Sequence, residues 1–223
     1  QGAVFGLCRA GVAAGCADGT GQAGACESIE DQYEIIGGSQ APWLATERRL
    51  FVTSAFFDVG VAYDPVSSPD SFASVEDADA ICQAAAVAAG LDRGNPYRAW
   101  LSGVTSAGVV SPATRFQQAA VPYVLVDGTP VAANWADLVD GTLLNPIDRD
   151  EFGDPVLGEP KFDDVWTGTQ ADGHASSHRC NEWKGNDPVL KGHTMSTDEG
   201  WSQLVTRLNC FVGAEARFFC FEQ

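Results

Sequence analysis

The chain has 223 residues, of which 45% are hydrophobic and 10% aromatic, and its formal net charge is −17 at pH 7. This composition supports a folded core and excludes a disordered or fibrous protein. The acidic excess repels phosphates and anionic lipids, so we expect no nucleic-acid partner and no membrane insertion. The sequence begins with neither a methionine nor a signal peptide, so we expect a processed piece of a longer precursor.

Residues 1–48 differ in composition from the rest of the chain. Glycine and alanine dominate, and Cys8, Cys16 and Cys26 punctuate the segment. We interpret it as an N-terminal arm or the remnant of a small disulfide module, followed by a main domain over residues 49–223. None of the seven cysteines forms a Cys-x-x-Cys pair, so zinc-ribbon and thioredoxin-type motifs are absent. Cys82 and Cys220 lie in strongly apolar sequence, as buried half-cystines often do, which favours an oxidised, extracellular protein over free buried thiols in a cytosolic one. Because seven is odd, at least one of these three cysteines is free, bonded to another chain, or bonded to residues removed upstream.

The first clear elements of the main domain are a strand and a long helix. Residues 49–57 (RLFVTSAFF) are rich in β-branched and aromatic residues and predict a strand. Ser74 is a candidate N-cap, with Asp77 three residues later as its capping-box partner. Apolar residues then repeat at helical spacing over residues 78–89, and Gly90 supplies a stop signal.

Shorter elements follow. Residues 97–103 alternate like a strand, Ser111-Pro112 opens a short helix, and Asp127-Gly128 predicts the turn of a hairpin. A second short helix ends before Gly141, and a long loop region with a hairpin near residues 151–155 comes next. The closing short strands are expected in VWTG, RCNEW, RLNCFV and ARFFCFE. One long helix, one or two short helices and many short strands predict an α+β fold.

An acidic run in the loop region is the strongest electrostatic feature. Between residues 140 and 164 stand eight acidic residues against Arg149 and Lys161. Such a loop either binds calcium, which takes six to eight oxygen ligands, or is a solvated acidic loop, which we favour because no EF-hand pattern is present. The calcium ligands would be Asp148, Asp150, Glu151 and Asp154.

Other candidate sites are weaker. His174 and His178, with Asp172 nearby, have the spacing of a metal pair on a helix, but Gly173 and the serines at 176–177 indicate a loop. No Gly-x-Ser-x-Gly motif and no Cys–His pairing stands out, so we expect a protein that is not an enzyme and requires no cofactor. A carboxylate pair for glycoside cleavage is the alternative, because such a pair is recognised by its spacing in three dimensions and not in sequence.

Aromatic side chains are candidate ligand contacts. We expect at least three of the tryptophans at 100, 135, 166, 183 and 201 to lie in the core. Trp183 and Trp201, flanked by glycine, serine and asparagine, are the better surface candidates. Tyr63 and Phe72, in or beside a Pro/Ser-rich loop, are further candidates for ligand contact.

Several motifs in register give the chain a resemblance to a known fold. These are ADAICQAAAVAAGL, YRAWLSG, PYVLVDGTPVAANWADLVDG, VWTGTQADGHASSHRCNEW and NCFVGAEARFFCFE. Together they resemble the endostatin-like branch of the C-type-lectin-like fold, and most of all a bacterial family of endostatin-like surface proteins. The resemblance implies nested disulfides, Cys82 to Cys220 and Cys180 to Cys210. It does not extend to the heparin and zinc sites of animal endostatin, because this domain is acidic and no histidine lies in the first forty residues.

These observations lead to three functional hypotheses. The first is a non-catalytic extracellular binding or adhesion module on a bacterial cell surface, whose partner is a protein or glycan with little negative charge. The second is a structural subunit of an extracellular filament or surface layer that binds copies of itself, with residues 1–48 as the assembly arm. The third is a calcium-dependent glycan-binding lectin.

Overall fold

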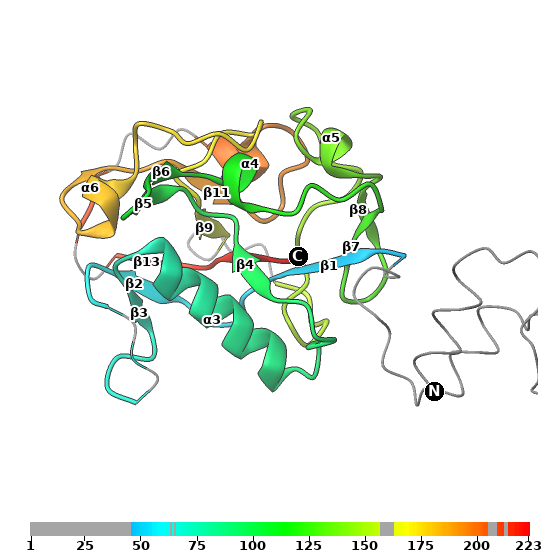
Figure 1. Cartoon of the computed structure of the whole chain (residues 1–223), viewed down its shortest axis with the longest axis horizontal. Coiled ribbons are helices and arrows are strands. Elements are labelled where there is room, and N and C mark those ends of the chain that lie inside the picture. The colour runs from blue at the N-terminus through cyan, green and yellow to red at the C-terminus, as the bar shows by residue number, and fades with distance from the viewer. Residues whose placement is uncertain (1–45, 63, 65, 157–162, 205–208, 212–213) are drawn as a thin grey trace, which may run out of the picture. The chain divides into compact units, whose positions relative to one another are not determined.

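The computed structural model of the chain describes residues 46–62, 64, 66–156, 163–204, 209–211 and 214–223. The arm, with Cys8, Cys16 and Cys26, and the candidate contact Tyr63 lie outside the described residues. In chain order the elements are β1 (Arg48–Val52), β2 (Phe57–Val59), β3 (Ser71–Phe72), α3 (Val75–Ala88), β4 (Tyr97–Ala99), β5 (Gly103–Thr105), β6 (Gly108–Val110), α4 (Pro112–Arg115), β7 (Tyr123–Leu125), β8 (Pro130–Ala132), α5 (Trp135–Leu138), β9 (Asp164–Trp166), α6 (Cys180–Trp183), β10 (Asp187–Pro188), β11 (Lys191–His193), α7 (Gly200–Gln203), β12 (Asn209–Cys210), β13 (Glu215–Ala216) and β14 (Phe219–Glu222) (Figure 1).

A five-stranded sheet in the order β4-β14-β1-β7-β8 forms the centre of the domain. The last strand, β14, runs antiparallel to β1 on one side and to β4 on the other, and β1 runs parallel to β7. The first and last strands of the described domain therefore lie side by side. The remaining strands form one three-stranded and three two-stranded sheets.

Alternation along the central strands separates two hydrophobic clusters. Leu50 and Phe221 face each other in the register and belong to one cluster, whereas Phe51 and Cys220 face each other and belong to the other. Successive side chains of a strand point to opposite faces of the sheet. The central sheet therefore buries both of its faces: α3 covers one, and the segments after β8 cover the other.

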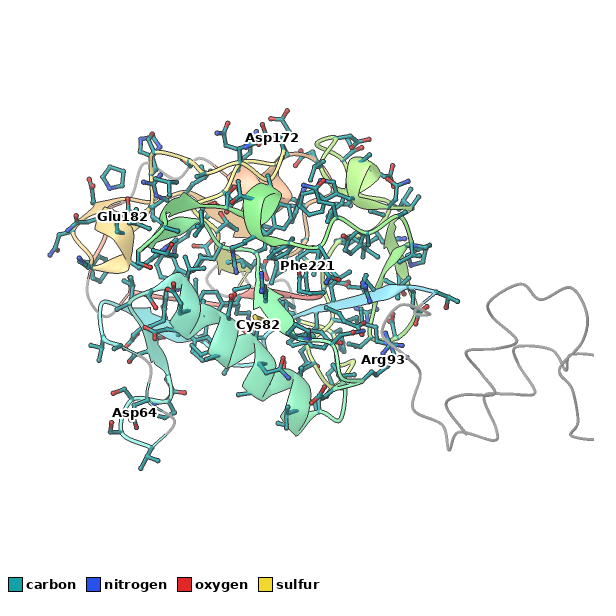
Figure 2. All side chains as sticks on the ribbon, in the orientation of Figure 1. Asp64, Cys82, Arg93, Asp172, Glu182 and Phe221 are labelled. Atoms are coloured by element: carbon teal, nitrogen blue, oxygen red, sulfur yellow. A yellow bond between two sulfur atoms is a disulfide. The ribbon has the colours of Figure 1, made fainter. Side chains whose placement is uncertain are left out.

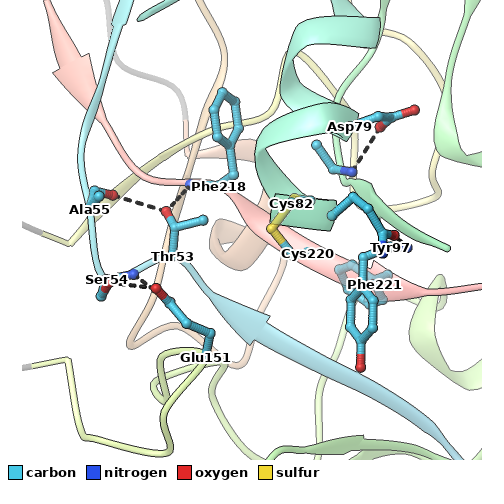
Figure 3. The surroundings of a disulfide bond; sticks show 12 residues. Thr53, Ser54, Ala55, Asp79, Cys82, Tyr97, Glu151, Phe218, Cys220 and Phe221 are labelled. Carbon is cyan, nitrogen blue, oxygen red and sulfur yellow. Dashed lines mark hydrogen bonds between the residues drawn. A yellow bond between two sulfur atoms is a disulfide. The ribbon is translucent and has the colours of Figure 1, made fainter. Parts of the chain in front are cut away.

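The long helix α3 forms as its sequence predicts. The Ser74 side chain accepts a hydrogen bond from the Asp77 backbone N–H at 3.0 Å, and the Asp77 carboxylate accepts one from the backbone N–H of Ala73 at 2.9 Å. Gly90 follows the helix with φ +70°, a left-handed conformation that favours glycine at this position. The buried face of α3 includes Cys82, which is bonded to Cys220 on β14 (Figure 3).

The short elements predicted between residues 97 and 138 are also present, and the structure adds the hairpin of β5 and β6, which was not predicted. β4 lies within the predicted strand, and α4 begins after the N-cap Ser111 with Pro112 at its first position. β7 and β8 form an antiparallel pair around Asp127-Gly128. α5 begins after Asn134, whose side chain accepts a hydrogen bond from the Asp137 N–H at 3.1 Å. The described domain is therefore α+β, with one long helix.

Two strand predictions were wrong. The run 49–57 is not one strand: β1 ends at Val52 and β2 begins at Phe57 in a different sheet, with a buried Thr53 at the break. Residues 180–183 are not a strand but a turn, α6, in which every residue has a positive φ between 53° and 66°. A left-handed conformation costs about 1–2 kcal/mol per non-glycine residue, so this turn must be held by its surroundings.

The surroundings of this turn fix it at three points. Cys180 is bonded to Cys210 on β12, and the Trp183 indole N–H donates to the backbone carbonyl of Ser102 at 2.8 Å. Arg179, next to the turn, forms an ion pair with Glu182 at 2.5 Å. Both disulfides implied by the resemblance are thus present. No helix in the described part of the chain is long and apolar enough to cross a membrane.

Candidate functional site

The loop region after α5 has few regular elements, yet a buried polar network holds it in place. The Trp100 indole N–H donates to Ser202 Oγ at 2.7 Å, and Ser202 Oγ donates to the Thr169 carbonyl at 2.9 Å. Thr167 Oγ1 donates to the Ser202 carbonyl at 2.7 Å, and the hydroxyls of Ser102 and Thr169 are 2.8 Å apart. All five residues are buried. Buried hydrogen bonds of this kind hold their partners in one conformation. The loops next to Thr169 and Ser202 are therefore supported by a rigid network.

Three of the predicted ligand contacts are wrong, because their side chains are buried. Trp183 is 1% exposed, and Trp201 and Phe72 are fully buried. Phe72 packs in a ring cluster with Trp183 and Phe218, at centroid distances of 5.4 and 4.8 Å. The polar neighbours of the two tryptophans lie in turns and carry no information on where the indole points. Four of the five tryptophans considered are core residues, which confirms the expectation of at least three.

Of the four carboxylates expected to bind calcium, three are directed to other partners. Asp150 is buried, and its Oδ1 accepts the backbone N–H groups of Phe152 and Asp154, both at 2.9 Å. Glu151 is also buried and accepts the N–H and hydroxyl of Ser54, at 2.7 and 2.5 Å. Asp148 forms an ion pair with Arg149 at 2.9 Å. The fourth, Asp154, is exposed, and its carboxylate has no hydrogen bond or ion pair among the described residues.

A cation of the chain itself, Arg217, acts on the buried carboxylates. Arg217 interacts electrostatically with Asp150, Glu151 and the buried Asp163, and burial lowers the pKa of Arg217. Its guanidinium donates to the carbonyls of Thr53 and Ser54. Burial also raises the pKa of Asp163, despite the nearby cations. Asp150, Glu151 and Asp163 are therefore buried within electrostatic reach of an arginine, and the prediction of a solvated loop is wrong for these three residues.

No metal centre is formed by the described residues. No three histidine, cysteine, aspartate or glutamate side chains among them are grouped so that they could hold an ion. His174 and His178 are exposed and lie in a loop, not on a helix. His193 lies elsewhere, with its Nε2 3.6 Å from the buried carboxylate of Asp163.

Three exposed loops are joined into one surface, which we call the acidic loop face: residues 139–144, 170–175 and 195–200. The Leu143 N–H donates to the Thr197 carbonyl at 2.8 Å and joins the first loop to the third. Gln203 joins the other two, because its Oε1 accepts the Ala171 N–H at 3.2 Å and its Nε2 donates to Glu199 at 2.6 Å. In Figure 2, Asp172 lies on the side of the domain opposite to Asp64.

The carboxylates of this face are fixed by their own loops. Asp140, Asp172 and Asp198 each use Oδ1 to accept the backbone N–H two residues later, at 2.9 to 3.0 Å. These short turns leave the second oxygen of each carboxylate directed to no hydrogen-bond donor among the described residues. Glu199 is the fourth acidic residue, and no lysine or arginine occurs in the three loops. Leu144 and Met195 add exposed apolar surface.

This arrangement presents carboxylate oxygens that are fixed in position, with no lysine or arginine in the same loops, beside apolar side chains. Such a surface attracts cationic groups and hydrogen-bond donors such as hydroxyls, and it repels anions. The sequence predicted the candidate calcium site at residues 148–154 and did not predict the acidic loop face. The available signal was the repeated Asp-x-(Thr/His/Gly) spacing, which indicates a carboxylate held by the backbone two residues ahead. Comparison of the sequence with protein families and with curated proteins gives no match.

Proposed function

We propose that this protein is a non-catalytic extracellular binding module of a bacterial surface, and that it binds its partner through the acidic loop face. The partner is a protein segment or glycan that presents cationic groups or hydroxyls and little negative charge. The observation that carries the proposal is the set of preset carboxylates on three interlinked loops, without a lysine or arginine among them.

The architecture supports this proposal. Binding residues are often found on irregular loops that a rigid scaffold positions. Here the scaffold is the central sheet, which α3 and the Cys82–Cys220 disulfide hold together, and the buried network around Ser202 supports the loops. Because hydrogen bonds fix the carboxylates before binding, little conformational entropy is lost when a ligand arrives.

We further propose that the domain has the endostatin-like variant of the C-type-lectin-like fold. The support is topological: the first and last strands pair antiparallel, the long helix lies between them in sequence, and the disulfide 180–210 is nested inside the disulfide 82–220. Both disulfides are compatible with an oxidising, extracellular location. Calcium is not required by the proposed binding mode, because the acidic loop face is the ligand surface itself.

The test is a binding screen with matched charge variants. The wild-type chain and the double variant Asp172→Asn/Asp198→Asn are applied to glycan and matrix-protein arrays. Asparagine preserves the side-chain oxygen that accepts the turn N–H, so the variant loses charge but keeps its loop geometry. The control is Asp64→Asn/Asp92→Asn, which changes two aspartates with similar turns outside the face.

The expected result is saturable binding to basic or neutral ligands by the wild type and the control, and at least about tenfold weaker binding by the loop-face variant. Absence of saturable binding to any array member, or equal loss in both variants, would refute the proposal.

A further inference from the structure

The hairpin of β5 and β6 is a separate two-stranded sheet with unusual surface properties. Val104 and Val109 lie opposite each other in its register, and they are 45% and 57% exposed. β5 contacts the left-handed turn α6 through Gly103, which lies against the Trp183 indole, so the base of the hairpin is anchored in the core. Among the described residues, no strand pairs with the outer edge of β6.

The hairpin lies in the longest stretch of the chain without a charged or histidine side chain, residues 99–114. In a protein with a net charge of −17, most approaches between two copies bring like charges together. The hairpin itself therefore adds no charge to the repulsion between two copies.

Each of the other described sheets has a charged residue or a proline on at least one edge strand, and this one has none. Arg98 lies on edge strand β4, Pro130 on β8, Pro188 on β10, Lys191 on β11 and Glu215 on β13. Charged residues and prolines on edge strands are the usual means by which proteins prevent strand pairing with another chain. Among the described sheets, only the β5–β6 sheet contains neither a charged residue nor a proline.

We infer that β6 is a self-association site, at which the β6 strands of two copies pair antiparallel around a two-fold axis near Val109. The result is a four-stranded sheet in the order β5-β6-β6-β5 across the two copies. A two-fold contact is self-complementary, so one uncharged strand supplies both the backbone hydrogen bonds and the valine contacts of the interface. This inference is independent of the acidic loop face, which contains no residue of the hairpin.

The experiment is sedimentation velocity on the full chain carrying Cys8→Ser, Cys16→Ser and Cys26→Ser, so that no disulfide of the arm can link two copies. The protein is studied from micromolar to near-millimolar concentration, at low and at high sodium chloride. Val109→Lys is compared with Val87→Lys, which introduces the same charge at a valine of similar exposure, 54%, on α3. Circular dichroism verifies that both variants are folded.

We expect a reversible dimer that tightens with salt, because salt screens the repulsion between the two acidic copies. Val109→Lys should weaken the dimer at least about tenfold, since it places two like charges next to the symmetry axis. Val87→Lys should dimerise like its parent. A parent chain that stays monomeric over the whole concentration range, or an equal effect of both lysine variants, would overturn the inference.

Discussion

Replacing Arg217 with methionine tests whether the inward-folded acidic residues depend on their internal cation. The substitution keeps much of the side-chain volume but removes the charge near Asp150, Glu151 and Asp163. Removing one partner of a fully buried ion pair costs about 3–5 kcal/mol, and we take about 2 kcal/mol because Arg217 is only half-buried. The carbonyls of Thr53 and Ser54 lose their donor as well, at about 1 kcal/mol each. The expected loss is about 4 kcal/mol in the free energy of unfolding at neutral pH.

The pH dependence of this loss gives the sharper test. In the wild type, burial already raises the pKa of Asp163, and Arg217 opposes this rise. Without the cation this pKa rises further above that of the unfolded chain, so the folded variant takes up the proton at a higher pH than the folded wild type. The difference in the free energy of unfolding between the variant and the wild type should therefore shrink as the pH falls into the range where carboxyl groups titrate. Urea denaturation of both proteins over this range measures it, with Asp163→Asn as a second substitution that should recover part of the loss. A deficit that stays constant with pH, or no recovery by Asp163→Asn, would refute the reasoning.

Three further predictions concern the scaffold. Replacing Cys82 and Cys220 by alanine should lower the free energy of unfolding by about 5 kcal/mol, because the bond closes a loop of sequence separation 138; urea denaturation of oxidised protein measures this loss. Asn181→Val should destabilise by about 1–2 kcal/mol and Asn181→Gly should not, because φ is 53° there; equal thermal midpoints for the two variants would contradict the left-handed turn. Burial raises the pKa of Tyr97, so the folded chain keeps a proton that the unfolded chain releases at about pH 10. The free energy of unfolding should therefore fall as the pH rises above that value. Ultraviolet absorbance should show the ionisation of Tyr97 only together with unfolding.

The elements that could be predicted from sequence are those whose signals are local. The capping box of Ser74, the Ser111-Pro112 start and the Asp127-Gly128 turn each act within a few residues, and the structure has the element expected at each. The left-handed turn at 180–183 could not be predicted, because distant partners hold it: Cys210 through a disulfide and Ser102 through the Trp183 hydrogen bond.

The candidate site was harder to predict for the same reason. Polar neighbours suggested that Trp201 is exposed, but burial is decided by packing against Trp100 and Phe219, which are remote in sequence. The acidic run suggested a solvated or calcium-binding loop, but three of its carboxylates are buried within electrostatic reach of Arg217, which lies more than fifty residues later in the sequence. Local composition shows how many charged residues a segment has, but it does not show whether their side chains point to solvent or to the interior.

Hydrogen exchange of the protein bound to its strongest array ligand tests the central claim most directly. If the acidic loop face is the binding surface, backbone amides in residues 139–144, 170–175 and 195–200 should become protected on binding, while those of α3 and the 64–70 loop should not change. Protection centred on α3, or no change in the three loops at saturating ligand, would contradict the account.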